Sequence, residues 1–172
     1  KLNQVVNELT EKGFTYSTTE TFGTQILGIY LVDERILDIE KYLSDKYGYV
    51  SKDMQIEQLQ FLVDCYKNAS PICEKECALL LQSIHNRKIP KNYEELDDVF
   101  KAISFIENNQ TDLYIREVSM KIYGDSKYFE NVTLQPVCIL LRKYSNRTLE
   151  ENELIDEILV EYHIYKEPQK LY

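Results

Sequence analysis

The sequence predicts an α+β fold that is predominantly α-helical, with a β-hairpin near the N-terminus. Apolar residues recur at helical spacing through most of the 172-residue chain. Glycine and proline are scarce, at 5 and 4 residues, which disfavours a β-sandwich with many tight turns. Because 44% of the residues are hydrophobic, the chain can bury a core, and we do not expect disorder.

The first 32 residues predict part of a winged helix. Residues 2–12 carry an apolar stripe at helical spacing, and Gly13 is suited to end that helix in the left-handed conformation. Residues 14–20 and 25–32 are typical of strands, and the four residues between them are typical of a turn. A helix, a glycine and a hairpin form the closing half of a winged helix. The alternative is an amphipathic helix followed by an unrelated hairpin.

Residues 33–162 predict a multi-helix domain. Gly48 is suited to end its first helix, and Ser70 followed by Pro71 is a favoured start for a later one. The helix before Gly48 is expected to turn one apolar stripe inward, formed by Ile36, Ile39, Leu43 and Tyr47.

The clearest helical pattern covers residues 93–108, and further helices are predicted at 133–144 and 149–161. Acidic residues at positions 94, 95, 97 and 98 suit the start of a helix dipole, so we interpret them as solvated charge rather than as a metal site. Residues 163–172 alternate weakly. We expect them to be a linker or strand that leads to a C-terminal domain missing from this sequence.

Charge is unevenly distributed along this acidic chain. The formal net charge is −9, which by itself disfavours nucleic acid as a partner. Residues 1–115 carry 12 basic and 19 acidic side chains, and residues 148–172 carry 2 and 7. Residues 116–147 carry 6 basic and 3 acidic side chains, so this segment alone is net positive.

The sequence also indicates the cellular compartment in which we expect the protein. No apolar run approaches the length of a membrane span, and the first residues lack a signal-peptide pattern. Four cysteines in a chain of this length predict reduced thiols and a cytoplasmic protein. Cys73 and Cys77 are one helical turn apart and could place two thiolates on a zinc ion. Both lie on an apolar stripe, however, so we favour buried thiols.

A candidate anion site at residues 115–130 lies almost entirely within this net-positive segment. A helical pattern ends at Gly124, and Asp125 or Ser126 can cap a new helix carrying Lys127. Backbone N–H groups at such a junction, with cations nearby, can hold a phosphate. The simpler alternative is a corner between two helices. The candidate DNA or anion contacts are Arg116, Ser119, Lys121, Asp125, Ser126, Lys127, Arg142 and Lys143.

No catalytic constellation is visible. The chain has no glycine-rich phosphate loop, no dinucleotide-binding fingerprint and no Asp-x-Asp pair after an apolar strand. His85 and His163 lie near the ends of predicted elements, without an evident serine or cysteine partner. We therefore predict that this stretch is not an enzyme, with no catalytic residue and no metal of its own.

Two short motifs carry a resemblance to a known family. Arg116-Glu117-x-Ser119 is followed by Gly124-Asp125-Ser126-Lys127 and then by Phe129-Glu130. This pattern resembles a signature of the nuclease subunit JetD of Wadjet anti-plasmid defence systems. In addition, residues 9–13 and 28–31 resemble the end of that family's winged-helix region, and residues 162–168 resemble the segment before its Toprim domain.

The resemblance implies a region of a machine that recognises and cuts closed-circular DNA. Its implied partners are double-stranded DNA and the subunits of an SMC-type complex. The family's Toprim domain, which binds a divalent metal through a Glu and an Asp-x-Asp strand, would lie beyond Tyr172. No residue here matches those metal ligands. The predicted function is thus the non-catalytic, DNA- and partner-engaging region of a Wadjet-type, JetD-like nuclease subunit.

The acidic charge of this chain is unlike that of a strong DNA-binding protein, and it supports an alternative function. The first helix offers only Lys1 and Lys12 as cations, beside Glu8 and Glu11, so phosphate or protein contact is favoured over base reading. The acidic charge and the 14 tyrosines suit a protein-interaction or dimerisation scaffold without nucleic-acid contact. A homodimer is the partner expected in that case.

Overall fold

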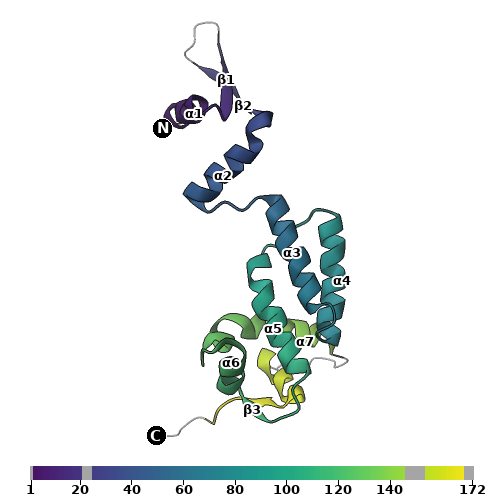
Figure 1. The fold of residues 1–172 in the computed structure, drawn as a ribbon. Helices are drawn as coiled ribbons and strands as arrows, with labels where there is room; N and C mark the ends of the chain where they lie inside the picture. The colour runs from purple at the N-terminus through teal and green to yellow at the C-terminus, as the bar shows by residue number, and fades with distance from the viewer. Residues whose placement is uncertain (1, 21–24, 146–153, 169–172) are drawn as a thin grey trace. The chain divides into compact units, whose positions relative to one another are not determined.

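The computed structural model describes residues 2–20, 25–145 and 154–168 (Figure 1). It confirms the mostly helical α+β fold, in which a helix and a β-hairpin precede a multi-helix region. The chain divides into two compact units, Lys1–Gln55 and Ile56–Tyr172. The helix that follows the hairpin belongs to the first unit.

The first unit begins with the predicted helix and hairpin. Helix α1 (Leu2–Glu11) is followed by Gly13, whose φ of +69° is the left-handed conformation that favours glycine. Strands β1 (Thr15–Thr19) and β2 (Ile26–Leu31) pair antiparallel, with a bulge at the end of β1. The predicted turn at 21–24 lies outside the described residues.

Helix α2 (Ile36–Tyr47) also belongs to the first unit and follows a short 3-10 turn, η1 (Asp33–Arg35). As predicted, it ends at Gly48 in the left-handed conformation. Its contacts centre on Tyr42, whose ring lies 5.3 Å from the buried ring of Phe14 and whose hydroxyl donates a hydrogen bond to Glu8 of α1. Lys46 donates to both Tyr42 and Glu8.

The predicted inward stripe of α2 is wrong at its two ends. Ile36 is 42% exposed and Tyr47 is 66% exposed, and no residue of this helix is buried. The reason is that α2 contacts the rest of its unit through Tyr42 and Lys46, which lie about a quarter-turn around the helix from the stripe. The first unit therefore packs through an aromatic and charged face and leaves apolar side chains exposed.

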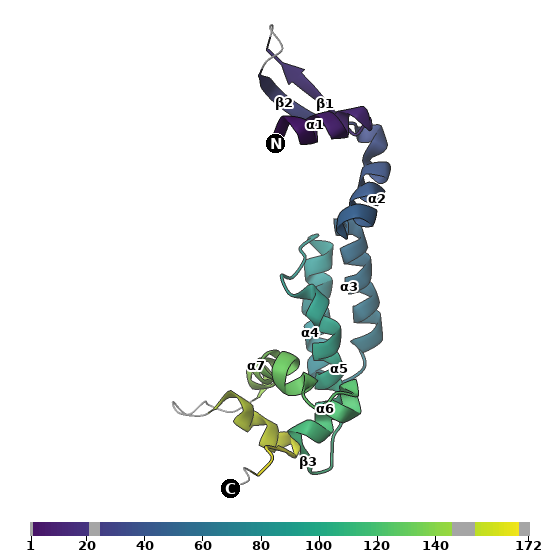
Figure 2. The same cartoon turned by 90° about the vertical axis from the view of Figure 1, so that its left-hand side faces the viewer.

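The second unit contains three helices that run side by side, namely α3 (Lys52–Tyr66) from Ile56 onward, α4 (Pro71–His85) and α5 (Leu96–Glu107) (Figures 1 and 2). A 3-10 turn, η2 (Tyr93–Glu95), leads into α5. The predicted start of α4 is confirmed, because Ser70 caps it by accepting a hydrogen bond from the N–H of Cys73 and Pro71 lies in its first turn.

Beyond α5 the chain forms a compact end to this unit. Strand β3 (Leu113–Tyr114) leads into helix α6 (Ile115–Tyr123), and a π-helix η3 (Phe129–Thr133) leads into α7 (Leu134–Tyr144). A 3-10 helix η4 (Ile155–Tyr162) precedes β4 (Ile164–Tyr165), which pairs parallel with β3. The described residues of the tail thus pack on this unit, and Ile164 is only 1% exposed.

The helix predicted at 133–144 has no separate start at Thr133. Helix α7 begins at Leu134 and continues directly from η3, whose last residue, Thr133, is buried. Pro136 supplies a physical reason, since it has no N–H to donate to the carbonyl of Val132 and its ring crowds that carbonyl. A wider π turn just before the proline accommodates both effects. The predicted start of the next helix, at 148–149, lies outside the described residues.

Of the four acidic residues at the start of α5, Glu94, Glu95 and Asp97 are exposed as predicted, and Asp98 is half-buried. Asp97 accepts a hydrogen bond of 3.0 Å from the hydroxyl of Tyr66, and Asp98 accepts one of 2.6 Å from Tyr128. The hydroxyl of Tyr123 donates to the backbone carbonyl of Asp98. These carboxylates therefore connect α5 to α3 and to the residues before η3.

The helices of the second unit contribute side chains to one hydrophobic core, which includes three cysteine thiols. Cys73, Cys77 and Cys138 are buried free thiols, whereas Cys65 is exposed. The largest fully buried side chains of this unit are Phe100, Phe129, Leu59, Ile103, Ile106, Leu141, Ile158, Leu159 and Ile164. In the described part of the chain, no helix combines the length and the apolar character needed to cross a membrane.

We expect one fast-reacting thiol in the folded protein. Burial raises the pKa of Cys77 to about 11 and that of Cys138 to about 12, and it also raises the pKa of Cys73, so their reactive thiolates are disfavoured. In a titration with a disulfide reagent at pH 8, one thiol per chain should react rapidly. The other three should react only after denaturation. Cys65→Ser should remove the rapid phase, and a second rapid thiol in the wild type would contradict the prediction.

Candidate functional site

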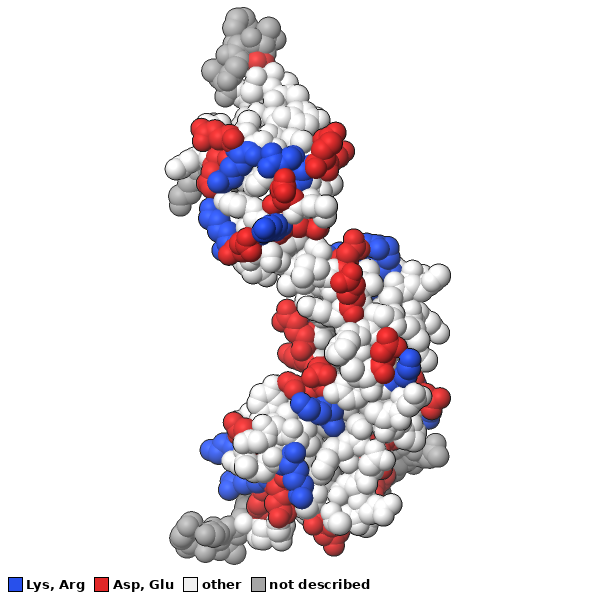
Figure 3. Space-filling model, in the orientation of Figure 1, with Lys and Arg blue, Asp and Glu red and all other residues white. Residues whose placement is uncertain are grey.

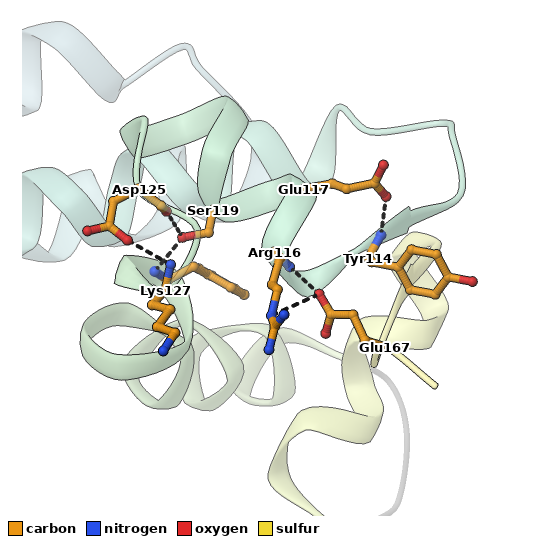
Figure 4. Close-up of polar contacts among 8 residues, drawn as sticks. Tyr114, Arg116, Glu117, Ser119, Asp125, Lys127 and Glu167 are labelled. Atoms are coloured by element: carbon orange, nitrogen blue, oxygen red, sulfur yellow. Dashed lines mark hydrogen bonds and ion pairs between the residues drawn. The ribbon is translucent and has the colours of Figure 1, made fainter. Parts of the chain in front are cut away.

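The predicted anion site is a junction fixed by one buried hydroxyl. Helix α6 ends at Gly124, which is left-handed with a φ of +71°. The hydroxyl of Ser119, fully buried, donates a hydrogen bond to the carbonyl of Asp125 and accepts one of 2.9 Å from the N–H of Phe129 (Figure 4). It therefore ties the end of α6 to the start of η3.

A second side chain closes the same turn. The carboxylate of Asp125 accepts a hydrogen bond of 2.7 Å from the N–H of Lys127. The N–H groups of Lys127 and Phe129 are therefore both bound by side chains of the chain itself. An anion held at this junction would depend on the cationic side chains around it rather than on these two N–H groups.

The start of α6 is occupied by two carboxylates. Glu117 accepts a hydrogen bond of 2.8 Å from the N–H of Tyr114, and Glu167 accepts one of 2.9 Å from the N–H of Arg116 (Figure 4). The same oxygen of Glu167 lies 3.8 Å from the Nε atom of Arg116. Negative charge is favourable there because the helix dipole presents its positive end.

Two of the predicted basic contacts have structural partners. Arg142 donates hydrogen bonds to the backbone carbonyls of Leu154 and Ile155, and so joins α7 to η4. Lys143 donates to Glu76 of α4 over 2.5 Å, and that contact raises the pKa of Lys143. Both side chains link elements of the second unit.

The remaining basic candidates are at the surface of α6 and the junction. Lys121 and Lys127 are exposed, and neither has an ion pair within residues 2–20, 25–145 and 154–168. The side chain of Arg116 is 60% exposed despite its contact with Glu167. In Figure 4 the side chains of Arg116 and Lys127 extend in the same direction. Ser126, the last predicted contact, is half-buried.

A charged cleft of about 860 Å³ lies beside Arg116. Lys166, on its wall, forms an ion pair of 2.7 Å with Asp156, which is 11% exposed. Two cationic side chains, Arg116 and Lys166, therefore line the cleft, and each lies beside a carboxylate. Its lining residues are Ile115, Arg116, Glu130, Leu134, Asp156, Lys166, Glu167 and Pro168.

The described residues form no continuous basic surface on the face shown in Figure 3 and no cluster of metal-ligating side chains. On the face shown in Figure 3, basic and acidic side chains are interspersed over both units and do not form one continuous basic surface. Within the described residues, no group of three or more His, Cys, Asp or Glu side chains is arranged to hold a metal ion.

Sequence reasoning missed Glu167 as a member of this site. It is 51 residues away from Arg116 along the chain, and it reaches the start of α6 only because β4 pairs with β3. No spacing rule connects positions that far apart. The signature residues Glu117, Ser119 and Asp125 were singled out from sequence, and the structure shows them as hydrogen-bond partners of the backbone.

No protein-family profile, no curated protein and no solved structure matches this chain. The resemblance to the Wadjet nuclease subunit therefore stays a prediction, carried by the motif residues around the junction.

The buried hydroxyl of Ser119 should contribute to the stability of the fold. Ser119→Ala removes both hydrogen bonds of the buried hydroxyl and leaves the N–H of Phe129 and the carbonyl of Asp125 without their partner. We expect the free energy of unfolding to fall by about 2–3 kcal/mol. Urea unfolding followed by circular dichroism measures this change.

Ser126→Ala is the matched control, because it deletes a hydroxyl seven residues away on the same junction that has no hydrogen bond within the described residues. Its effect should stay within about 0.5 kcal/mol. Equal effects of the two substitutions would contradict the role assigned to Ser119.

Proposed function

We propose that this chain is a DNA- and partner-engaging region of a JetD-like nuclease subunit of a Wadjet-type system, without chemistry of its own. The observation that carries the proposal is the exposure of three cations, Arg116 and Lys121 on α6 and Lys127 just beyond its end. Ser119 and Asp125 hold the backbone of the turn that carries Lys127.

The chemistry of this surface suits the phosphate backbone rather than base edges. Lysine is a flexible point charge that binds phosphate oxygens, and arginine can bind them through a planar fork. Each phosphate contact contributes about 0.9 to the slope of log K against log salt. With three cations on an acidic chain, we propose weak, sequence-independent binding with a slope between about 2 and 3.

The proposal predicts that removing two of the exposed cations weakens DNA binding. Lys121→Gln with Lys127→Gln should lower the affinity for a 30-base-pair duplex, of a length chosen to exceed the binding site, by about tenfold at low salt. It should also reduce the salt slope by about 1.8. Fluorescence anisotropy across a salt titration measures both quantities.

Lys88→Gln with Lys91→Gln is the matched control. It makes the same change in charge at two exposed lysines in the loop between α4 and η2. The control should change the affinity less than twofold and leave the slope unchanged. If both double variants bind the duplex like the wild type at every salt concentration, the DNA-binding proposal fails.

A second function is favoured by a different observation, made on the first unit. Strand β2 leaves a row of apolar side chains in solvent: Leu27 is 64%, Ile29 is 44% and Leu31 is 54% exposed. Tyr16 and Tyr30 stack across the other face at 5.2 Å and are also about half exposed. Contiguous exposed apolar surface is typical of protein contacts. As the alternative, we propose a protein-interaction or dimerisation scaffold.

Sedimentation equilibrium distinguishes the dimerisation scaffold from the DNA-binding region. Under it, the wild-type chain self-associates with increasing concentration, and DNA does not change the association. Leu27→Lys with Leu31→Lys should shift the dissociation constant at least tenfold towards monomer, because charge would be buried at the contact. Thr18→Lys with Thr19→Lys adds the same charge to the hairpin without removing apolar side chains, and should have a smaller effect. A wild type that stays monomeric would exclude dimerisation through this face.

A further inference from the structure

We propose that Glu167 competes with DNA phosphate for Arg116, so that the C-terminal segment of the second unit restrains DNA binding. This inference rests on the proposed DNA-binding function, because it names how that same surface is regulated. The restraining contact is within the chain: Glu167 bonds the N–H of Arg116 at 2.9 Å and lies 3.8 Å from its Nε atom.

The carboxylate occupies a position that a phosphate oxygen can use. It accepts a backbone N–H in the first turn of α6 and lies beside a guanidinium group. Carboxylate and phosphate oxygens accept the same hydrogen bonds from arginine and from helix N–H groups. While Glu167 is bound, part of the charge of Arg116 is neutralised before any DNA arrives.

The contact is weak enough to be exchanged. The side chains of Arg116 and Glu167 are 60% and 34% exposed, and ion pairs open to solvent contribute little net stability. The Nε–oxygen distance of 3.8 Å is also long for a hydrogen bond, so only the backbone N–H is held at short range. A phosphate therefore competes with one hydrogen bond and one loose ion pair.

The segment that carries Glu167 is anchored just before it. Ile164 is 1% exposed and pairs with Leu113 across the β3–β4 ladder, and Lys166 pairs with Asp156 at 2.7 Å. Rotation of the Glu167 side chain can therefore free Arg116 without unfolding β4. The adjoining cleft of about 860 Å³ gives the released side chain room to move.

The competition is reciprocal, as any thermodynamic coupling must be. Phosphate bound to Arg116 displaces Glu167, and Glu167 bound to Arg116 weakens phosphate. DNA engagement at α6 is thereby coupled to the position of the backbone at Glu167 and Pro168. The inferred device is an internal carboxylate that lowers affinity for DNA until it is displaced.

The test uses the full chain, a fluorescent 30-base-pair duplex and equilibrium titrations at several salt concentrations. Glu167→Gln keeps an oxygen that can accept the N–H of Arg116 but removes the charge. We expect it to tighten binding about threefold and to raise the salt slope by less than about 0.9, the value for one whole phosphate contact, because Arg116 already makes part of that contact in the wild type. Arg116→Gln should weaken binding, and the double variant should bind like Arg116→Gln alone.

Asp64→Asn is the matched control, because it also removes a carboxylate from an exposed ion pair, that with Lys67 at 2.8 Å. It reports the effect of a net charge that is less negative by one, and should change the affinity less than 1.5-fold. Circular dichroism melting of each variant verifies that the fold is intact.

The outcomes separate this inference from the proposed function. If Glu167→Gln binds like Asp64→Asn while Arg116→Gln weakens binding, the competition is wrong and the DNA-binding function stands. If Glu167→Gln tightens binding equally in the Arg116→Gln background, Arg116 is not the contested group and the inference is wrong. If neither the wild type nor Glu167→Gln binds the duplex, the inference and the proposed function are both overturned.

Discussion

The arrangement of the second unit depends on the buried hydroxyl of Ser119. This one group satisfies a carbonyl and an N–H on the two sides of the turn between α6 and η3, where solvent cannot replace it. The N–H belongs to Phe129, whose fully buried ring fixes η3 in the core. Because η3 continues into α7, the position of Val137 and Leu141 in that core follows from the same turn.

Local signals in the sequence predicted the ends of elements well. Gly13, Gly48 and Gly124 all adopt the left-handed conformation at the end of a helix, as their positions after apolar stripes indicated. Ser70 and Pro71 start α4 for reasons contained within four residues. Such features depend on the dihedral preferences of one residue or on a hydrogen bond to a near neighbour, so a sequence read without a structure can identify them.

Features that depend on contacts distant in sequence were not predictable in the same way. The face through which α2 packs is set by the contact of Tyr42 with Phe14, and the apolar stripe alone did not reveal it. The role of Glu167 depends on the pairing of β4 with β3, two strands of only two residues each. The candidate site was therefore predicted as a turn with nearby cations, while the partners that restrain Arg116, Arg142 and Lys143 required the structure.

The structure also changes what the signature residues argue for. Glu117, Ser119, Gly124 and Asp125 are engaged in holding the backbone of the junction. A sequence that keeps them should keep this turn, whatever it binds. Affinity for phosphate would instead depend on the exposed cations and on the carboxylate that competes for one of them. The motif therefore specifies the conformation of the turn, and any affinity for DNA depends on the exposed charges that the turn and α6 carry.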